Sequence, residues 1–176
     1  MTITKYGYHG TTQEAADRII AEHHFIDSNK NNEWLGTGVY FFEYKFHAEW
    51  WISVGKLKYH ETSILKAELN YTKDQELDLD DPDQLNEVNK IVQEFVKILD
   101  AKKDGKILAA NLSADASPEK WAFACNTARK FCPNIGIILY TFPTNPNLPL
   151  GASGFRQTQR QMCVSNHKII GTIHSV

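Results

Sequence analysis

Two glycines stand just before a short apolar run in the segment Leu35-Gly36-Thr37-Gly38-Val39-Tyr40-Phe41-Phe42. Glycine has no Cβ atom, so the main chain at these positions can turn sharply or lie close to a bulky ligand. The residues that follow are β-branched or aromatic, which predicts a strand over residues 39–42. The segment therefore predicts a loop that delivers Tyr40 to the start of a strand, beside open backbone.

A second glycine motif lies upstream, where Tyr8-His9-Gly10-Thr11-Thr12 places an imidazole beside a glycine at the end of a predicted strand. A lone histidine at a strand end is more often a structural residue with satisfied hydrogen bonds, and a strand tyrosine is commonly a core aromatic. The two motifs are roughly thirty residues apart in the chain. Their combination favours binding roles for His9 and Tyr40 over the structural ones.

Composition limits the classes of protein to consider. The chain has 176 residues, of which 42% are hydrophobic and 23% charged, values typical of one globular domain. A formal net charge of -2 argues against nucleic-acid binding through a broad basic face, and leaves a local basic groove open. The three cysteines have no CxxC spacing, so we expect neither a disulfide framework nor a zinc site. No signal peptide or membrane span is evident, and we expect a cytoplasmic protein without a membrane partner.

The apolar periodicity predicts an α+β fold in a single domain over residues 1–176. We expect helices over residues 12–22, 46–56, 85–99 and 118–132, and strands over residues 5–9, 39–42, 64–70, 135–142, 161–165 and 169–175. Thr11 and Glu14 have the spacing of a capping box, which predicts Thr11 as the cap of the first helix. The acidic stretch over residues 72–84 is expected to be a solvated loop leading into a helix, with a metal site as the alternative.

The two glycine motifs, in this order, resemble the first two signature motifs of the ADP-ribosyltransferase superfamily, enzymes that cleave NAD+ and transfer its ADP-ribose. The resemblance implies a split antiparallel β-sheet core with flanking helices and NAD+ in the cleft of the split. It also implies that His9 holds the adenosine ribose and that the main chain of Gly10 pairs with the nicotinamide carboxamide. Thr11 resembles the small hydroxyl residue that often follows.

The second motif implies the groups around the nicotinamide. Tyr40 matches the tyrosine whose ring lies against the nicotinamide, and Gly38 precedes it in the same cofactor-binding segment. In the superfamily, the next helix supplies a small residue and then an aromatic residue that covers the other nicotinamide face. Ala48 and Trp51 stand at these positions, with Ala48 where one branch of the family has serine or threonine. The neighbouring Trp50 is expected to be partly in the core.

The third motif opens a strand near the C-terminal end, where most members have a glutamate and this chain has Gln161. The resemblance implies catalytic roles for His9, Tyr40 and Gln161. A glutamine carbonyl can accept a hydrogen bond from a ribose hydroxyl, but it cannot act as a general base. Three possibilities follow: the acceptor is nucleophilic enough without deprotonation, another group supplies the base, or NAD+ binds without turnover.

The loop before this strand implies the contacts to the acceptor. Phe155 is suited to stacking and Arg156 to binding a phosphate, although an exposed loop arginine is an equally simple interpretation. Gln159 completes the expected acceptor-binding residues.

The implied function is that of an NAD+-dependent mono-ADP-ribosyltransferase of the prokaryotic toxin or anti-phage type, with NAD+ as substrate and no metal. Its acceptor is expected to be a macromolecule, with nucleic acid slightly favoured over protein, and a neutralising antitoxin is a further candidate partner. The alternatives are a non-catalytic module that binds NAD+ or ADP-ribose, and an enzyme like the RNA 2′-phosphotransferases. The few arginines in the sequence make the last of these the weaker alternative.

Overall fold

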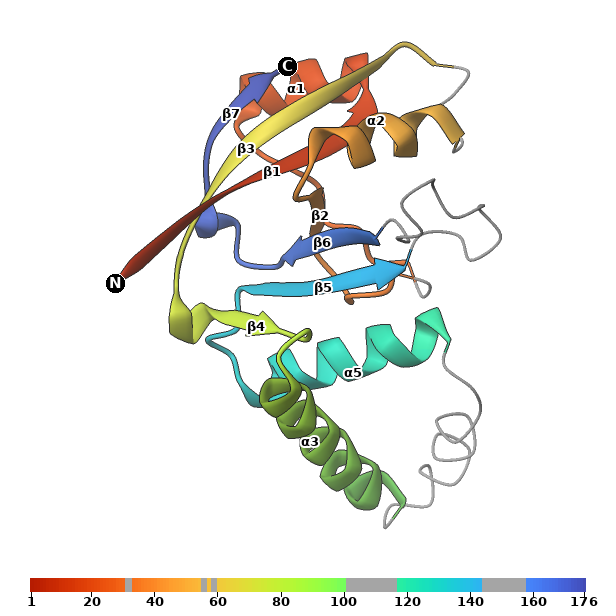
Figure 1. Cartoon of the computed structure of the whole chain (residues 1–176), viewed down its shortest axis with the longest axis vertical. Coiled ribbons are helices and arrows are strands. Elements are labelled where there is room, and N and C mark those ends of the chain that lie inside the picture. The colour runs from red at the N-terminus through yellow and green to blue at the C-terminus, as the bar shows by residue number, and fades with distance from the viewer. Residues whose placement is uncertain (31–32, 55–56, 58–59, 101–116, 144–157) are drawn as a thin grey trace, which may run out of the picture.

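The computed structural model describes residues 1–30, 33–54, 57, 60–100, 117–143 and 158–176, and its strands form one seven-stranded sheet with the order β4-β5-β6-β2-β1-β3-β7 (Figure 1). The strands are β1 (Thr2–Thr12), β2 (Val39–Phe42), β3 (Thr62–Thr72), β4 (Glu76–Asp78), β5 (Ile137–Pro143), β6 (Thr158–Val164) and β7 (Ile170–Ser175). The helices are α1 (Gln13–Glu22), α2 (Lys45–Val54), α3 (Pro82–Asp100) and α5 (Pro118–Phe131), with 3₁₀ turns η2 (Lys73–Gln75) and η3 (His167–Ile169). Only β4 and β5 pair in parallel within the described sheet. The expected α+β class is confirmed.

The sheet is divided into two halves at the junction between β1 and β2. These strands share a single residue pair, Tyr8 with Phe42. By contrast, β1 pairs with β3 along all of its 11 residues, and all four residues of β2 pair with β6. One half is therefore β1-β3-β7 and the other is β4-β5-β6-β2, and the two separate beyond the shared pair.

The two halves of the sheet meet in the largest core cluster. Leu65, Ala67 and Leu69 of β3 belong to the same buried cluster as Leu139 of β5 and Met162 of β6, and α1 adds further apolar side chains. Burial of each leucine or methionine side chain contributes about 1.5–3 kcal/mol to the free energy of folding. The hydrophobic effect thus holds together two half-sheets that main-chain hydrogen bonds barely connect.

The opposite face of the sheet is covered by helices on either side of the junction. Phe42 packs with α2 residues in one cluster, whereas Tyr40 packs against the cluster formed with α3 and α5. These two residues are two positions apart on β2, so their side chains project from the same face. Helix α2 and the pair α3–α5 therefore flank one face of β2. No helix in the described part of the chain combines the length and apolar character that a bilayer crossing requires.

The first helix begins one residue later than the sequence predicted. Thr12, and not Thr11, is the N-cap, and its Oγ1 accepts a hydrogen bond from the N–H of Ala15 at 3.2 Å. Strand β1 continues through Thr11 because it pairs with β3 along its whole length. Ser117 caps α5, and its hydroxyl oxygen accepts from the N–H of Lys120 at 3.3 Å.

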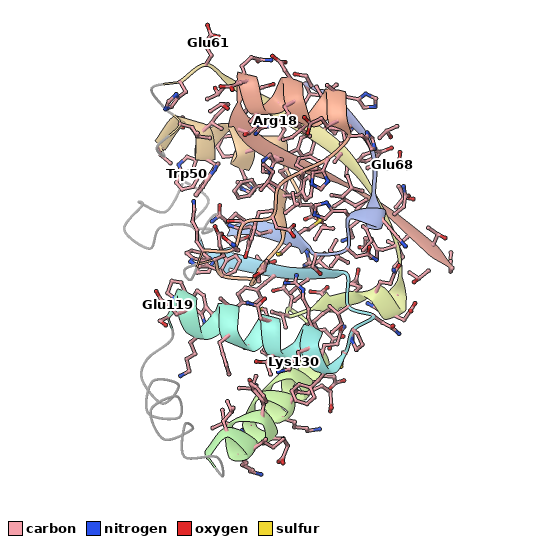
Figure 2. The ribbon with its side chains drawn as sticks, turned by 180° about the vertical axis from the view of Figure 1, so that it is seen from behind. Arg18, Trp50, Glu61, Glu68, Glu119 and Lys130 are labelled. Atoms are coloured by element: carbon pink, nitrogen blue, oxygen red, sulfur yellow. The ribbon has the colours of Figure 1, made fainter. Side chains whose placement is uncertain are left out.

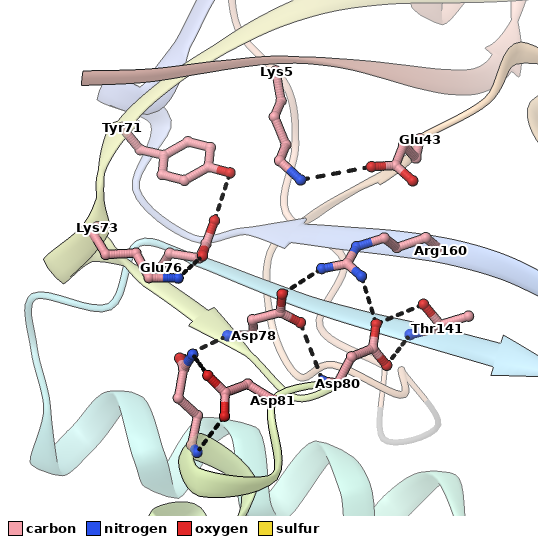
Figure 3. Close-up of polar contacts among 11 residues, drawn as sticks. Lys5, Glu43, Tyr71, Lys73, Glu76, Asp78, Asp80, Asp81, Thr141 and Arg160 are labelled. Atoms are coloured by element: carbon pink, nitrogen blue, oxygen red, sulfur yellow. Dashed lines mark hydrogen bonds and ion pairs between the residues drawn. The ribbon is translucent and has the colours of Figure 1, made fainter. Parts of the chain in front are cut away.

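The acidic stretch over residues 72–84 connects strands and is not simply a solvated loop. Arg160 of β6 binds Asp78 at 2.6 Å and Asp80 at 2.7 Å (Figure 3). Asp80 also accepts hydrogen bonds from the main-chain N–H and the hydroxyl of Thr141 on β5. Across the residues with described positions, no group of three or more His, Cys, Asp or Glu could hold a metal. The stretch ties β4 and its following turn to β5 and β6.

The loop before β2 is fixed by helix α5. Arg129 donates to the carbonyl oxygens of Leu35 at 3.2 Å and Thr37 at 2.8 Å, and the N–H of Thr37 donates to Asn126 Oδ1 at 3.0 Å. Gly36 has a φ of +80°, and a Cβ atom there would lie 2.4 Å from Asn126 Oδ1. Packing against α5 is therefore the physical reason for glycine at position 36.

We expect Gly36→Ala to lower the free energy of unfolding by about 1–3 kcal/mol, because alanine is strained at positive φ and its methyl group would displace Asn126. Chemical denaturation followed by circular dichroism measures this difference. The matched control is Gly171→Ala, where φ is not in the positive range and the nearest atom, Asn70 Nδ2, lies 3.0 Å from the added Cβ. Equal stability of the two variants would contradict the role assigned to Gly36.

Candidate functional site

The end of β1 directs main-chain polar groups into the gap between the two halves of the sheet. Ile64, which is opposite Gly10 on β3, accepts from the N–H of Val176 at 3.0 Å, so its carbonyl faces away from β1. Because main-chain groups in an antiparallel pair face each other or both face outward, the N–H and C=O of Gly10 point toward β2. The pairing of β1 with β2 is limited to Tyr8 and Phe42, so β2 gives Gly10 no partner.

His9 replaces a missing main-chain bond across this gap. Its Nδ1 donates to the carbonyl oxygen of Tyr40 at 2.8 Å, which leaves Nε2 as an acceptor. The ring packs edge-on against Phe25 and Phe41, with centroid distances of 5.3 and 5.9 Å. Burial lowers the pKa of His9, outweighing the opposing effect of the bond to Tyr40. The imidazole is therefore neutral near pH 7, with a lone pair on Nε2.

Tyr40 holds the glycine loop through its hydroxyl. The hydroxyl accepts from the N–H of Leu35 at 2.9 Å and donates to the carbonyl oxygen of Gly36 at 2.6 Å. Burial, followed by the nearby Cys163 thiol, raises the pKa of Tyr40 far above its ordinary value, so the phenol stays protonated. With both roles of the hydroxyl occupied, Tyr40 offers a ligand the surface of its ring and not its oxygen.

Gln161 lies close to Tyr40 on the adjacent strand. Tyr40 is opposite Cys163 and Phe42 is opposite Gln161, so Tyr40 and Gln161 are diagonal neighbours on one face. Such neighbours have Cα atoms about 7–8 Å apart, within reach of long side chains. The Gln161 side chain is partly buried and makes no hydrogen bond to any residue of the described part of the chain.

Helix α2 lies directly over Gly10. A Cβ atom at Gly10 would lie 2.6 Å from Ile52 Cγ2 and 3.1 Å from the carbonyl oxygen of Ala48, so only glycine allows this approach. Trp51 Cδ1 is 3.6 Å from the same point, and the Trp51 ring centroid is 6.4 Å from that of Phe42. Trp51 remains 50% exposed, whereas Ala48 is fully buried. Trp51 thus forms an accessible wall beside Gly10, and the methyl group of Ala48 has no accessible surface.

The structure corrects the interpretation of the glycine loop. The sequence suggested that Gly36 and Gly38 leave backbone open to a ligand. Instead, a Cβ atom at Gly38 would lie 2.6 Å from the carbonyl oxygen of Val164 and 2.8 Å from Cys163 Sγ, just as α5 fills the space at Gly36. Both glycines are needed because the loop packs closely against the protein itself.

The remaining expected residues lie at different distances from this junction. Thr11 is partly buried and shares the face of β1 that carries His9. Gln159 is 7% exposed and lies opposite Phe142 of β5, and its Oε1 has no partner within the described residues. Phe155 and Arg156 lie outside the residues that the structure describes.

Arg129 and Asn126 hold the glycine loop, and the sequence analysis did not identify either residue. Arg129 lies four residues after Cys125 and seven after Ala122, both buried on α5, so the helical period places it on the same covered face. Its guanidinium also donates to the carbonyl oxygen of Cys163 at 3.0 Å. A cation at a buried helical position was the signal that could have indicated this contact.

Comparisons with known proteins are limited to one short region. No protein-family model and no solved structure matches the chain. The uncharacterized protein MJ0359 of Methanocaldococcus jannaschii is 44% identical over 45 residues, which are 26% of this chain and 21% of that protein. The match thus spans about a fifth of the relative's length, and the relative's title names no activity.

We expect protonation of His9 to make folding less favourable at acidic pH. The unfolded imidazole takes up a proton near pH 6.5, whereas burial keeps the pKa of the folded residue lower. Below pH 6.5 the unfolded state binds more protons than the folded state. The stability that neutral His9 contributes is therefore fully present above pH 6.5 and is lost as the pH falls toward the lower folded pKa. His9→Asn keeps an N–H for the carbonyl of Tyr40 and should show a weaker acid dependence. Urea unfolding from about pH 7.5 to about pH 5 tests this, and identical pH slopes would refute it.

Proposed function

We propose that the protein is an NAD+-dependent mono-ADP-ribosyltransferase that binds NAD+ where β1 and β2 separate. The proposal rests on one observation: groups from three distant stretches border the same junction. Gly10 turns its main chain toward it, His9 crosses it to Tyr40, and Gln161 lies beside Tyr40 on the next strand. These are the residues that the resemblance to the ADP-ribosyltransferases selects.

The nicotinamide end of NAD+ fits the groups around Gly10. A carboxamide carries donors and an acceptor, and the outward N–H and C=O of Gly10 supply the complementary pair. Trp51 stands beside this position with half of its surface exposed. The ring of Tyr40 lies on the same face of the sheet as α2, so both aromatic residues are placed to cover a planar ring.

The ribose end fits His9 and Gln161. The neutral imidazole of His9 presents Nε2 as an acceptor for a ribose hydroxyl. The Gln161 carbonyl can accept a second ribose hydroxyl and turn its negative end toward the sugar. As the bond between ribose and nicotinamide breaks, nicotinamide leaves with the electron pair and positive charge grows on the ribose. A carbonyl dipole fixed beside that charge stabilises the transition state more than the ground state.

A non-catalytic role is the second candidate, because Gln161 cannot itself act as a general base. Asp78 and Asp80 are bound by Arg160, whose side chain leaves β6 on the face opposite to Gln161. In this alternative the protein binds NAD+ or ADP-ribose and releases no nicotinamide. A phosphotransferase is less well supported, because Arg129 and Arg160 are engaged by the glycine loop and by carboxylates.

The decisive experiment follows label from NAD+ carrying a radioactive adenylate. The protein is incubated with this NAD+ and separate pools of RNA, DNA and protein, and free nicotinamide is quantified in parallel. Transfer of label to a macromolecule supports the enzyme, and we place nucleic acid ahead of protein as the acceptor. Binding of NAD+ by calorimetry without nicotinamide release would favour the binding module. Absence of NAD+ binding would remove both candidates.

We expect Gln161→Ala and Tyr40→Ala each to reduce nicotinamide release by about 100-fold or more, because each removes a group placed against the reacting ribose or nicotinamide. Gln161→Ala should leave the unfolding transition unchanged, since its amide bonds to no described residue. Tyr40→Ala should also lower stability, because its hydroxyl holds the glycine loop. The control is Gln13→Ala on α1, and a rate unchanged in either site variant would exclude that residue from catalysis.

The adjacent residues Trp51 and Trp50 provide a test variant and a matched control for the proposed stacking on nicotinamide. We expect Trp51→Ala to weaken NAD+ binding about 5- to 150-fold, the loss of roughly 1–3 kcal/mol of stacking on one planar group. Trp50, at the outer flank of α2 in Figure 2, is 40% exposed, and Trp50→Ala should change the affinity less than about twofold. Calorimetric titration with NAD+ measures both. Equal losses would show that general disturbance of α2, and not stacking, is responsible.

A further inference from the structure

We infer that the cavity between α3 and α5 binds a nucleobase of a single-stranded nucleic-acid acceptor; this inference rests on the proposed function. The cavity measures about 780 Å³ and lies between the two helices, with β5 as its floor. Ligand pockets usually have volumes of about 300–1,000 Å³ and a mainly apolar lining. The volume is therefore sufficient for a nucleoside.

Aromatic side chains form the end of the cavity nearest to β5. Trp34 lies 4.4 Å from Phe142 and 5.6 Å from Trp121 between ring centroids, and Tyr140 lies 4.8 Å from Phe142. All of these pairs are tilted or edge-to-face, so none of the rings is stacked in parallel on another. Trp34, Trp121 and Tyr140 are only partly buried. This arrangement leaves ring surface on which a planar base can stack.

The aromatic end is continuous with the candidate NAD+ site. Tyr140 is opposite Gln161 between β5 and β6, and Phe142 is opposite Gln159. Leu35 lines the cavity and also donates its N–H to the hydroxyl of Tyr40. In Figures 1 and 2, the end of β5, the start of β6 and the first turns of α5 gather at one flank of the molecule. A base in the cavity would thus stand beside the ribose held at Gln161.

Polar groups suited to the edge of a base are present at the cavity. Asn89 and Gln93 are four residues apart on α3 and both line it, and each side-chain amide carries donors and an acceptor. Next to the lining residues, Gln159 is opposite Phe142 and 93% buried, and its Oε1 has no partner within the described residues. Amides of this kind read the donors and acceptors of an unpaired base.

A base also meets the chemical requirement that Gln161 sets. A ring or exocyclic nitrogen of a base attacks the anomeric carbon of the ribose, and the bond to nicotinamide breaks with its electrons leaving on nicotinamide. An exocyclic amino nitrogen then releases one of its protons to water, whereas a ring nitrogen that attacks through its lone pair carries no proton, and the positive charge of NAD+ passes to the base. No general base is needed before the attack, because the nitrogen lone pair is nucleophilic in the neutral base. A serine or threonine hydroxyl would need one, so the nucleobase is the better match.

Binding of a single-stranded oligonucleotide provides the test. Fluorescence anisotropy with labelled RNA and DNA of about 15 nucleotides measures affinity in the absence of NAD+. We expect Trp121→Ala to weaken binding about 5- to 150-fold, equivalent to about 1–3 kcal/mol per stacked base. Trp50→Ala is the tryptophan control and should change the affinity less than about twofold. Asn89→Leu removes the side-chain amide while keeping a side chain of similar size in the cavity wall. It provides a second variant if Trp121→Ala does not fold.

The two proposals fail in different ways. Nicotinamide release from NAD+ alone is measured without oligonucleotide and should be unchanged in Trp121→Ala, which lies outside the NAD+-binding residues. Loss of oligonucleotide binding with this release preserved supports the base site. Oligonucleotide binding that is absent in wild type or unaffected in both cavity variants overturns it, as does occupation of the cavity by an amphipathic peptide that oligonucleotides do not displace. No NAD+ binding by wild type would instead refute the proposed function.

Discussion

The single pair between Tyr8 and Phe42 is the constraint on which the rest of the structure depends. Both strands are fully committed to partners on their other edges, so the main-chain groups beyond this pair must find other bonds. Buried main-chain groups are rarely left unpaired. The main chain of Gly38 bonds with that of Ser28 at 2.9 and 3.0 Å, and the carbonyl oxygen of Tyr40 accepts a hydrogen bond from His9 Nδ1. Gly10 is left facing the opening, and the proposed function assigns its main-chain groups to the carboxamide of NAD+.

Much of the fold could be predicted from the sequence because it depends on local patterns. The apolar periods of α1, α3 and α5 and the β-branched runs of β2 and β5 gave element positions close to those observed. Element ends were less predictable, since β1 and β3 extend each other by mutual pairing. Strand β4 was missed because three residues in an acidic stretch carry no strand period, and only pairing with β5 makes them a strand.

The candidate site was likewise predictable from the sequence only in part. The order of His9, Gly10, Tyr40 and Gln161 is visible in the sequence, and so is the helix that carries Trp51. What the sequence could not show is how each group is used within the protein. The hydroxyl of Tyr40 is occupied by the glycine loop, and Ala48 is fully buried. Gly36 and Gly38 serve close packing, a requirement that depends on residues 89 or more positions away, such as Asn126.

Arg129 has a consequence for communication between the two parts of the molecule. One guanidinium donates to the carbonyls of Leu35 and Thr37 and to that of Cys163, and so connects α5 to the loop before β2 and to β6, the strand paired with β2. A displacement of α5 is therefore transmitted to the loop in which the carbonyl oxygen of Gly36 accepts the hydrogen bond of the Tyr40 hydroxyl. Under the two proposals, NAD+ and a nucleobase would bind on the two sides of Arg129, and by thermodynamic reciprocity each would alter the affinity for the other by the same factor.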